Sequence, residues 1–184
     1  PLLNRGTIYF SAKDGTLLTA ATLREIGTSH STSSSTATEH QRYYPGGSLA
    51  AQTIGFVAYN NDNEQKGRYG LERYYDQTLA RGGTDSYANL FVELFSGFAG
   101  AQTDGGEGDI ITTIEPSVEA ELERTLAVYG DSWHPALSGG IVMDPSNGEI
   151  VAMAVHPTFD LNHFNEQSDP GLFKNPQNES VYEM

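Results

Sequence analysis

The sequence LSGGIVMDPSNGEIVAMAV, from Leu137 to Val155, contains two apolar runs separated by a short polar turn. The turn includes Asp144, Pro145, Asn147 and Gly148. Pro presets the φ angle of a turn position, and Asn-Gly tolerates positive φ angles. The pattern therefore predicts a β-hairpin. Because both arms are continuously apolar, we expect the hairpin to lie in a sheet that is covered on both faces.

The composition indicates an ordinary globular protein with an acidic surface. The chain has 184 residues, a formal net charge of −14 and only ten Lys and Arg residues, which argues against nucleic acid and anionic membranes as partners. It has no Cys, which excludes disulfides and Cys-based zinc sites and fits an extracytoplasmic location. No run is long enough for a membrane span, and the first residues do not resemble a signal peptide. Because the sequence opens on Pro1 and closes on Met184, we expect an excised piece of a longer protein.

The first hundred residues contain several short segments of alternating type. Residues 7–10 and 16–20 predict a hairpin around Lys13-Asp14-Gly15. The polar, Ser- and Thr-rich residues 27–41 predict a flexible linker or a shortened loop. Residues 48–58 alternate in a way that favours a strand, with a helical turn as the weaker alternative.

Two further segments in this half have polar or helical patterns. Residues 60–66 are acidic and rich in Asn, and since their spacing does not follow an EF-hand we interpret them as a solvated turn rather than a Ca²⁺ site. A helix should begin at Gly67, with Leu71, Tyr74 or Tyr75, and Leu79 on one face. The pair Gly82-Gly83 should end it.

A strand and a longer helix are predicted before the hairpin. Residues 110–114 have strand composition, and Pro116 suits the first turn of a helix. The stripe of that helix consists of Val118, Leu122, Leu126 and Tyr129, and Gly130 should end it. After the hairpin, the chain becomes rich in Pro and Asn and is predicted to be loop-like.

No catalytic group emerges from the sequence. Gly46-Gly47-Ser48-Leu49-Ala50 begins like a nucleophile elbow but lacks its last Gly. None of the three lysines follows a Ser by three positions, and the five histidines have no metal-binding spacing. We therefore predict no catalytic residue, no metal site and no cofactor.

A set of Arg, Gly and Glu residues in turn-rich surroundings is more informative. It comprises Arg5 and Gly6, then Arg42, Tyr44, Pro45 and Gly47, and finally Gly67, Gly70 and Glu72. Arg prefers planar pairing with carboxylates, so we hypothesise that Arg5 or Arg42 pairs with Glu72 and ties distant segments together.

Taken in order, these segments resemble the class B penicillin-binding proteins, the membrane-anchored D,D-transpeptidases that crosslink peptidoglycan. Arg5-Gly6-Thr7-Ile8, Arg42-Tyr43-Tyr44-Pro45-Gly46-Gly47 and Gly67-Arg68-Tyr69-Gly70-Leu71-Glu72 resemble the motifs of the family's pedestal, or dimerisation, domain. Residues 113–115, 142–153, 157–162 and 175–183 are similar to the segment leading into its transpeptidase domain.

The match also has departures. The family's Asp-Arg-x-Gly after the first motif is replaced by Phe10-Ser11-Ala12-Lys13-Asp14-Gly15, and residues 28–38 stand where the family has a longer head region. Either this member lacks a head, or the head was removed and bridged. The family's catalytic Ser-x-x-Lys should follow Tyr182-Glu183-Met184, and Ser-x-Asn and Lys-Thr-Gly are also absent from the sequence.

The resemblance implies an α+β fold with an elongated, β-rich pedestal domain, followed by a helix and a hairpin of the transpeptidase sheet. Residues 1–110 would form the pedestal, with its shortened head at about residues 27–41, and residues 111–184 the incomplete start of the transpeptidase domain. The expected role is non-catalytic: positioning the catalytic domain and binding cell-wall synthesis proteins on the periplasmic side of the inner membrane. We also expect self-association, with a homodimer as one form, because the hairpin would be left partly exposed.

Two alternatives remain. The chain is one part of an active transpeptidase whose catalytic residues lie on another segment, or it is an unrelated acidic extracytoplasmic binding module. A companion polypeptide beginning with Gly-Ser-x-x-Lys favours the first, and a wide separation of Arg42 and Glu72 favours the second.

Overall fold

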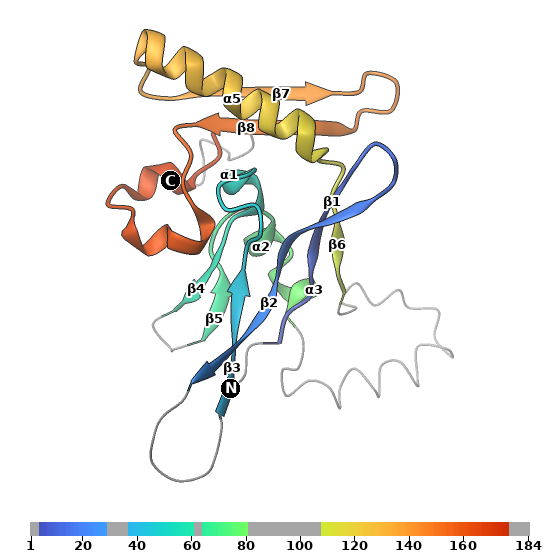
Figure 1. The fold of residues 1–184 in the computed structure, drawn as a ribbon, viewed down its shortest axis with the longest axis vertical. Helices are drawn as coiled ribbons and strands as arrows, with labels where there is room; N and C mark the ends of the chain where they lie inside the picture. The colour runs from blue at the N-terminus through green and yellow to red at the C-terminus, as the bar shows by residue number, and fades with distance from the viewer. Residues whose placement is uncertain (1–3, 29–36, 61–63, 81–107, 177–184) are drawn as a thin grey trace.

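The computed structural model describes residues 4–28, 37–60, 64–80 and 108–176. In chain order the strands are β1 (Ile8–Ser11), β2 (Leu17–Thr28), β3 (Ala37–Tyr43), β4 (Val57–Tyr59), β5 (Gln65–Gly67), β6 (Ile110–Ile111), β7 (Ser138–Met143) and β8 (Ile150–His156). The helices are α1 (Ala51–Ile54), α2 (Gly70–Tyr74), α3 (Asp76–Leu79) and α5 (Pro116–Trp133), with 3₁₀ helices η1 (Leu161–Glu166) and η2 (Pro170–Phe173). This content confirms the α+β prediction. The molecule is elongated, with α5 and the β7–β8 hairpin at one end and the β2–β3 arm at the other (Figure 1).

A four-stranded sheet in the order β3-β2-β1-β6 organises the first half of the chain. The predicted hairpin of β1 and β2 is confirmed, and β6 pairs with β1 in parallel. The linker prediction for residues 27–41 is wrong at both ends, because Gly27 and Thr28 lie in β2 and residues 37–41 lie in β3, in register with it. Ladder hydrogen bonds come from the backbone, so a polar segment can form a strand without a buried side chain. Residues 29–36 lie outside the described residues.

The strand predicted over residues 48–58 is mostly wrong, and the weaker helical alternative is correct for α1. Gly55, with a φ of 70°, ends that helix, and only from Val57 does the chain become strand β4. Residues 51–57 are all buried. The alternation of small and larger residues therefore did not mark one buried and one exposed face of a strand. Of the turn predicted at residues 60–66, residues 61–63 lie outside the described residues, and Gln65 and Lys66 belong to β5, which pairs with β4.

The helix predicted from Gly67 is two short helices, α2 and α3, the first beginning only at Gly70. Leu79 is fully buried, and Tyr75 packs against the core. Tyr74 is 81% exposed, so Tyr75 is the aromatic residue on the buried face. Gly82-Gly83 lies outside the described residues.

Helix α5 begins at Pro116, as predicted, but Gly130 does not end it. The helix continues to Trp133 and is capped by His134 in the left-handed conformation. Its buried residues are Glu119, Leu126 and Gly130, whereas Tyr129 is 58% exposed, which corrects the predicted stripe. The preceding strand β6 is also shorter than predicted and ends at Ile111.

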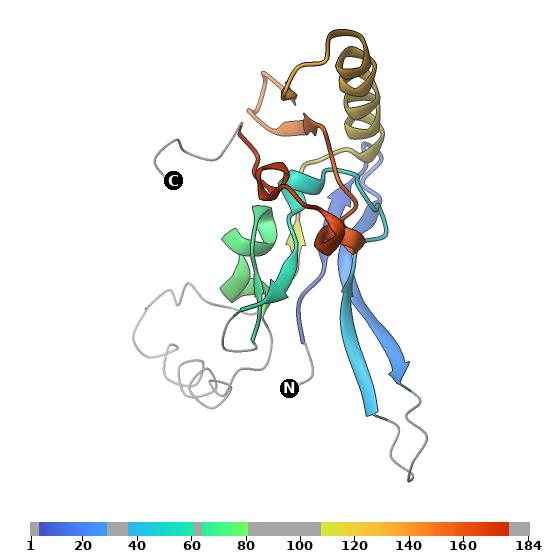
Figure 2. The same ribbon diagram turned by 90° about the vertical axis from the view of Figure 1, so that its left-hand side faces the viewer.

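The decisive hairpin is confirmed, with β7 and β8 antiparallel. Its burial differs from the prediction. Residues 152–155 of β8 are buried, but Ile141 and Met143 of β7 are 49% and 56% exposed. In the described residues the hairpin is a two-stranded sheet, and α5 covers one of its faces (Figures 1 and 2).

The core lies below this hairpin and joins both halves of the chain. It includes Ile8, Phe10, Ile54 and Leu79 from the first half and Ile114, Phe159, Leu161 and Phe173 from the second. Phe56 stacks on Phe164 with ring centroids 4.1 Å apart, and Phe173 meets Phe56 edge-on at 4.9 Å. The division at residue 110 stays a prediction. Among the described helices, none has the length and apolar character that crossing a membrane requires.

Candidate functional site

The carboxylate of Glu72 is shared by two arginines from distant parts of the chain. Nε of Arg5 donates to Oε2 at 2.8 Å, and Nε of Arg42 donates to Oε1 at 2.6 Å. Glu72 is fully buried, and the side chains of Arg5 and Arg42 are 1% and 4% exposed. The hypothesis that Arg5 or Arg42 pairs with Glu72 is therefore confirmed, and the structure shows that both arginines do so. We refer to Arg5, Arg42 and Glu72 as the Arg-Glu-Arg cluster.

The two guanidinium groups make further contacts with backbone carbonyls and with Asp76. Nη2 of Arg5 donates to the carbonyl of Glu72 at 2.9 Å and contacts Asp76 Oδ1 at 2.8 Å. Nη1 of Arg42 donates to the carbonyl of Gly6 at 2.6 Å. Within the described part of the chain, Nη2 of Arg42 has no hydrogen-bond partner. The cluster itself holds two arginines and one carboxylate, and the partly exposed carboxylate of Asp76 supplies a second negative charge beside Arg5.

The glycines of these motifs allow backbone segments to approach closely. A Cβ at Gly6 would overlap the carbonyl of Gly108, and one at Gly67 would overlap the carbonyl of Glu72. Gly70 has a φ of 55°, which L side chains rarely adopt, and a Cβ there would strike the carbonyl of Thr53. Gly67 and Gly70 thus allow the segment that carries Glu72 to pack closely against neighbouring backbone.

Tyr44 fixes the turn after β3. Its buried hydroxyl accepts a 3.0 Å hydrogen bond from the N–H of Val57, and Asn162 binds both its N–H and its carbonyl at 3.0 and 2.9 Å. Burial raises the pKa of the Tyr44 hydroxyl well above its usual value, and the charge of Glu72 adds to the rise. Pro45 is exposed in the turn, and the N–H of Gly47 closes it on the Tyr44 carbonyl at 3.0 Å.

The residues predicted for the hairpin turn also act as the sequence indicated. Oδ1 of Asp144 accepts from the N–H of Ser146 at 2.8 Å, and Oδ1 of Asn147 accepts from the N–H of Glu149 at 2.9 Å. Gly148 has a φ of 81°. The side chain of Pro145 is exposed.

Two carboxylates of α5 join the helix to the rest of the molecule. Oε2 of Glu119 accepts from the N–H of Met153 in β8 at 2.7 Å, and Oε1 of Glu123 accepts from the N–H of Ala50, just before α1, at 2.7 Å. Burial raises the pKa of Glu123 to about 7, opposed by the Ala50 hydrogen bond and assisted by Glu119. Burial also raises the pKa of Glu119, against the effect of the Met153 hydrogen bond.

Several of these positions were missed by the sequence predictions. Asp76 and Asn162 carry no local signal, because their partners are 71 and 118 positions away in Arg5 and Tyr44. Glu119 and Glu123 could have been found, since they continue the helical spacing of Leu126 and Gly130 toward the start of α5.

The Arg-Glu-Arg cluster joins distant segments of the chain. Its side chains are almost fully buried and are paired with one another. Its contacts join the segment before β1, strand β3 and helix α2. Among the described residues, no group of three His, Asp or Glu side chains could hold a metal ion.

The sequence is similar to those of several known proteins. The chain is 30% identical over 135 residues to stage V sporulation protein D of Bacillus subtilis, an alignment that covers 72% of this chain and 20% of that protein. It is 30% identical over 146 residues to the probable peptidoglycan D,D-transpeptidase FtsI of Caulobacter vibrioides, covering 79% of this chain and 20% of the relative. No family model matches the sequence.

Solved structures share the fold. Penicillin-binding protein 3 of Mycobacterium tuberculosis, complexed with aztreonam, matches with a TM-score of 0.65 and 23% identity over 95% of this chain and 33% of its own. Penicillin-binding protein 2X of Streptococcus thermophilus matches with a TM-score of 0.53 and 20% identity over 73% of this chain and 21% of its own. The chain spans about a fifth of the length of the curated relatives it matches. By sequence and fold, the chain is a member of the class B penicillin-binding proteins.

Proposed function

We propose that this chain is a non-catalytic, load-transmitting part of a peptidoglycan D,D-transpeptidase. It would hold the transpeptidase portion of the longer protein in position during cell-wall synthesis. The single observation that carries the proposal is the Arg-Glu-Arg cluster. Its buried charged groups join three segments of the chain and are paired with one another, so they are not available to react with a substrate.

Contacts between the two halves of the chain support this role. The N–H of Ala50 binds Glu123, the hydroxyl of Thr53 binds the carbonyl of Met153 at 3.0 Å, and Asn162 binds Tyr44. The Thr53 bond is buried and the other two are partly buried. Breaking such a bond leaves a desolvated group without a partner, so these contacts oppose displacement of one half of the chain relative to the other. The hairpin would therefore be held rigidly on the sheet-rich base.

Our proposal for partners and location is supported by the relatives, which include peptidoglycan D,D-transpeptidases and a penicillin-binding protein. We propose that the chain acts outside the cytoplasm as part of a membrane-anchored protein. Its partners would be the transpeptidase domain and other proteins of cell-wall synthesis.

Intact-mass measurement after incubation with benzylpenicillin tests the non-catalytic role. We expect no covalent adduct on residues 1–184, because the sequence contains no Ser-x-x-Lys motif. The penicillin-binding protein PbpB of Mycolicibacterium smegmatis, treated in the same way, is the positive control. An adduct on this chain would contradict the proposal, since it would reveal a nucleophile in these residues.

A further inference from the structure

Three hydrogen bonds join helix α5, strand β8 and the start of α1 in a closed ring. In α5, Oε1 of Glu123 accepts from the N–H of Ala50 at 2.7 Å. One turn earlier, Oε2 of Glu119 accepts from the N–H of Met153 in β8 at 2.7 Å, and the carbonyl of Met153 accepts from the hydroxyl of Thr53 in α1 at 3.0 Å. Helix α1 lies between the α5 and hairpin end of the molecule and the strands of the first half (Figure 1). We call these five residues the junction ring.

The two carboxylates of the junction ring have no cation to pair with among the described residues. Glu119 is fully buried, and within the same residues its Oε1 has no hydrogen-bond partner. The bonds that Glu119 and Glu123 accept there come from backbone N–H groups. An ionised carboxylate in such a place lacks the partners that offset its loss of water, so the ring favours a bound proton.

The elements packed around Glu123 add no compensating charge. Neither α1, with the sequence AQTI, nor residues 151–155 of β8, with the sequence VAMAV, contains an ionisable side chain. On α5 itself, Arg124 pairs with Glu121 on the exposed side. Glu119 is the charged neighbour that acts on Glu123, and two negative charges one turn apart oppose each other.

Ala50 is held in a strained backbone conformation. Its φ of 54° and ψ of 34° lie in the left-handed region, which is unfavourable for residues other than glycine. Ala50 is 2% exposed, and its N–H depends on Glu123 for its hydrogen bond. A strained residue that is held by one carboxylate is a place where the fold can open locally.

We propose that Glu123 and Ala50 form a proton-dependent latch in the junction ring. With a proton on Glu123, the latch is closed and α5 with its hairpin is fixed to α1. When Glu123 loses the proton, its carboxylate turns toward solvent, the N–H of Ala50 is released and the junction opens locally. The inference rests on the proposed positioning role and adds a regulation to it, since the hairpin would be held most firmly in acidic surroundings.

The pH window of the latch follows from the raised pKa of Glu123. The proton contributes fully to closure below the ordinary pKa of 4.5, and its contribution is lost as the pH rises through the folded-state pKa of about 7. Within this window the equilibrium constant for opening should rise about tenfold per pH unit. Above the window it should level off.

Hydrogen exchange of the Ala50 amide, followed by NMR on ¹⁵N-labelled residues 1–184, measures this opening. After correction for the intrinsic exchange rate, the protection of Ala50 should fall about tenfold per pH unit from pH 4.5 to pH 7 and then become constant. Amides of the central strand β2 should be more strongly protected at every pH, because their exchange requires wider unfolding.

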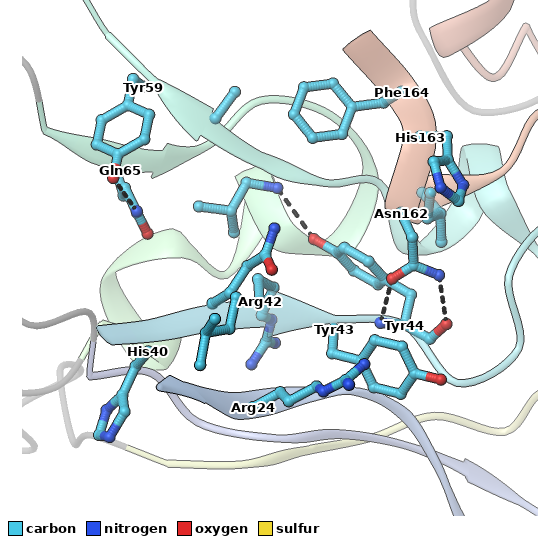
Figure 3. A pocket seen from close by; sticks show the side chains of 15 residues that line it. Arg24, His40, Arg42, Tyr43, Tyr44, Tyr59, Gln65, Asn162, His163 and Phe164 are labelled. Atoms are coloured by element: carbon cyan, nitrogen blue, oxygen red, sulfur yellow. Dashed lines mark hydrogen bonds between the residues drawn. The ribbon is translucent and has the colours of Figure 1, made fainter. Parts of the chain in front are cut away.

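The Tyr44 amide is an internal control. It donates to Oδ1 of Asn162 at 3.0 Å, a tie between the two halves that uses a neutral side chain (Figure 3). Asp160, which contacts Asn162, has its pKa lowered by the hydrogen bond from His163 and is ionised throughout the window. The protection of Tyr44 should therefore stay constant from pH 4.5 to pH 7.

Matched variants isolate the proton. Glu123→Gln keeps an oxygen for the N–H of Ala50 but cannot titrate, so the protection of Ala50 should become independent of pH. Glu121→Gln, on the exposed side of α5, should behave like the parent. Circular dichroism checks that both variants fold.

Three outcomes would overturn the latch. They are a protection of Ala50 that does not change with pH in the parent, the same slope in Glu123→Gln as in the parent, and equal protection of Ala50 and the β2 amides. None of them affects the benzylpenicillin test, so the proposed function and the latch can fail separately.

Discussion

Gly130 of helix α5 packs against the imidazole ring of His156 at the end of β8, so closely that a Cβ at Gly130 would overlap Nε2 and Cδ2. This contact explains why a glycine lies inside a helix, where it costs about 1 kcal/mol relative to Ala. Without a side chain at this position, α5 can pack close to β8.

A double-variant comparison tests this packing. Gly130→Ala alone should lower the free energy of unfolding, because the ring must move from its site. In a His156→Ala background the same change should raise stability by about 1 kcal/mol, the helix preference of Ala over Gly. Urea denaturation measures both, and an equal effect in the two backgrounds would show that the ring is not the obstacle.

The left-handed conformation of Gly70 predicts a large cost for Gly70→Ala. Strain at positive φ costs about 1–2 kcal/mol, and here the new Cβ would also strike the carbonyl of Thr53. Gly15→Ala is the matched control, because Gly15 has a φ of 83° and nothing lies within 4 Å of its Cβ position. We expect Gly70→Ala to unfold at a clearly lower urea concentration than Gly15→Ala, and similar midpoints would count against the close approach.

Because the pKa of Glu123 is raised, we predict that the free energy of unfolding decreases as the pH rises from about 4.5 to about 7. Its folded-state pKa of about 7 exceeds the ordinary 4.5, so the native state holds a proton that the unfolded state has released. Glu119 and His163 have raised pKa values as well and act in the same direction.

The variant Glu123→Gln isolates this contribution. It keeps an oxygen for the N–H of Ala50 and removes the charge, so the slope of stability against pH should become shallower. Glu121→Gln serves as the control, since Glu121 is exposed and its Arg124 contact lowers its pKa below this window. Thermal melts in buffers from pH 4.5 to pH 8 measure the slopes, and parallel curves for Glu123→Gln and the parent would disprove the assignment.

The exposed strand β7 predicts self-association at high protein concentration. Ile141 and Met143 are about half exposed at the edge of a two-stranded sheet, a surface that can pair with another strand. Met143→Lys should reduce association, because a lysine on an edge strand opposes pairing. Sedimentation velocity across a concentration series gives the readout, and a parent protein that stays monomeric throughout would refute the prediction.

Local patterns predicted the elements whose cause is local. The hairpin at residues 138–156 follows from its turn residues, and the start of α5 follows from Pro116. Gly130 misled the helix boundary because its role is tertiary, in contact with His156. A helix-ending glycine and a packing glycine look alike in a sequence.

Non-local features were predicted only where side-chain chemistry demanded a partner. The prediction that Arg5 or Arg42 pairs with Glu72 was correct, since Arg prefers a carboxylate partner, but that both arginines share Glu72 depends on the whole fold. Strand β3 was missed because it pairs through its backbone, and a polar strand lacks the apolar alternation that a sequence shows.

The most direct test of the account is the free energy of unfolding of Glu72→Gln compared with Glu121→Gln. Glu72 is fully buried between Arg5 and Arg42, whereas Glu121 pairs with Arg124 at 62% exposure. Removing a buried partner strands the opposite charges and costs about 3–5 kcal/mol, while a solvent-exposed pair contributes little. We predict that Glu72→Gln loses several kcal/mol or fails to fold while Glu121→Gln resembles the parent; equal, small losses in both variants would contradict the central role of the Arg-Glu-Arg cluster.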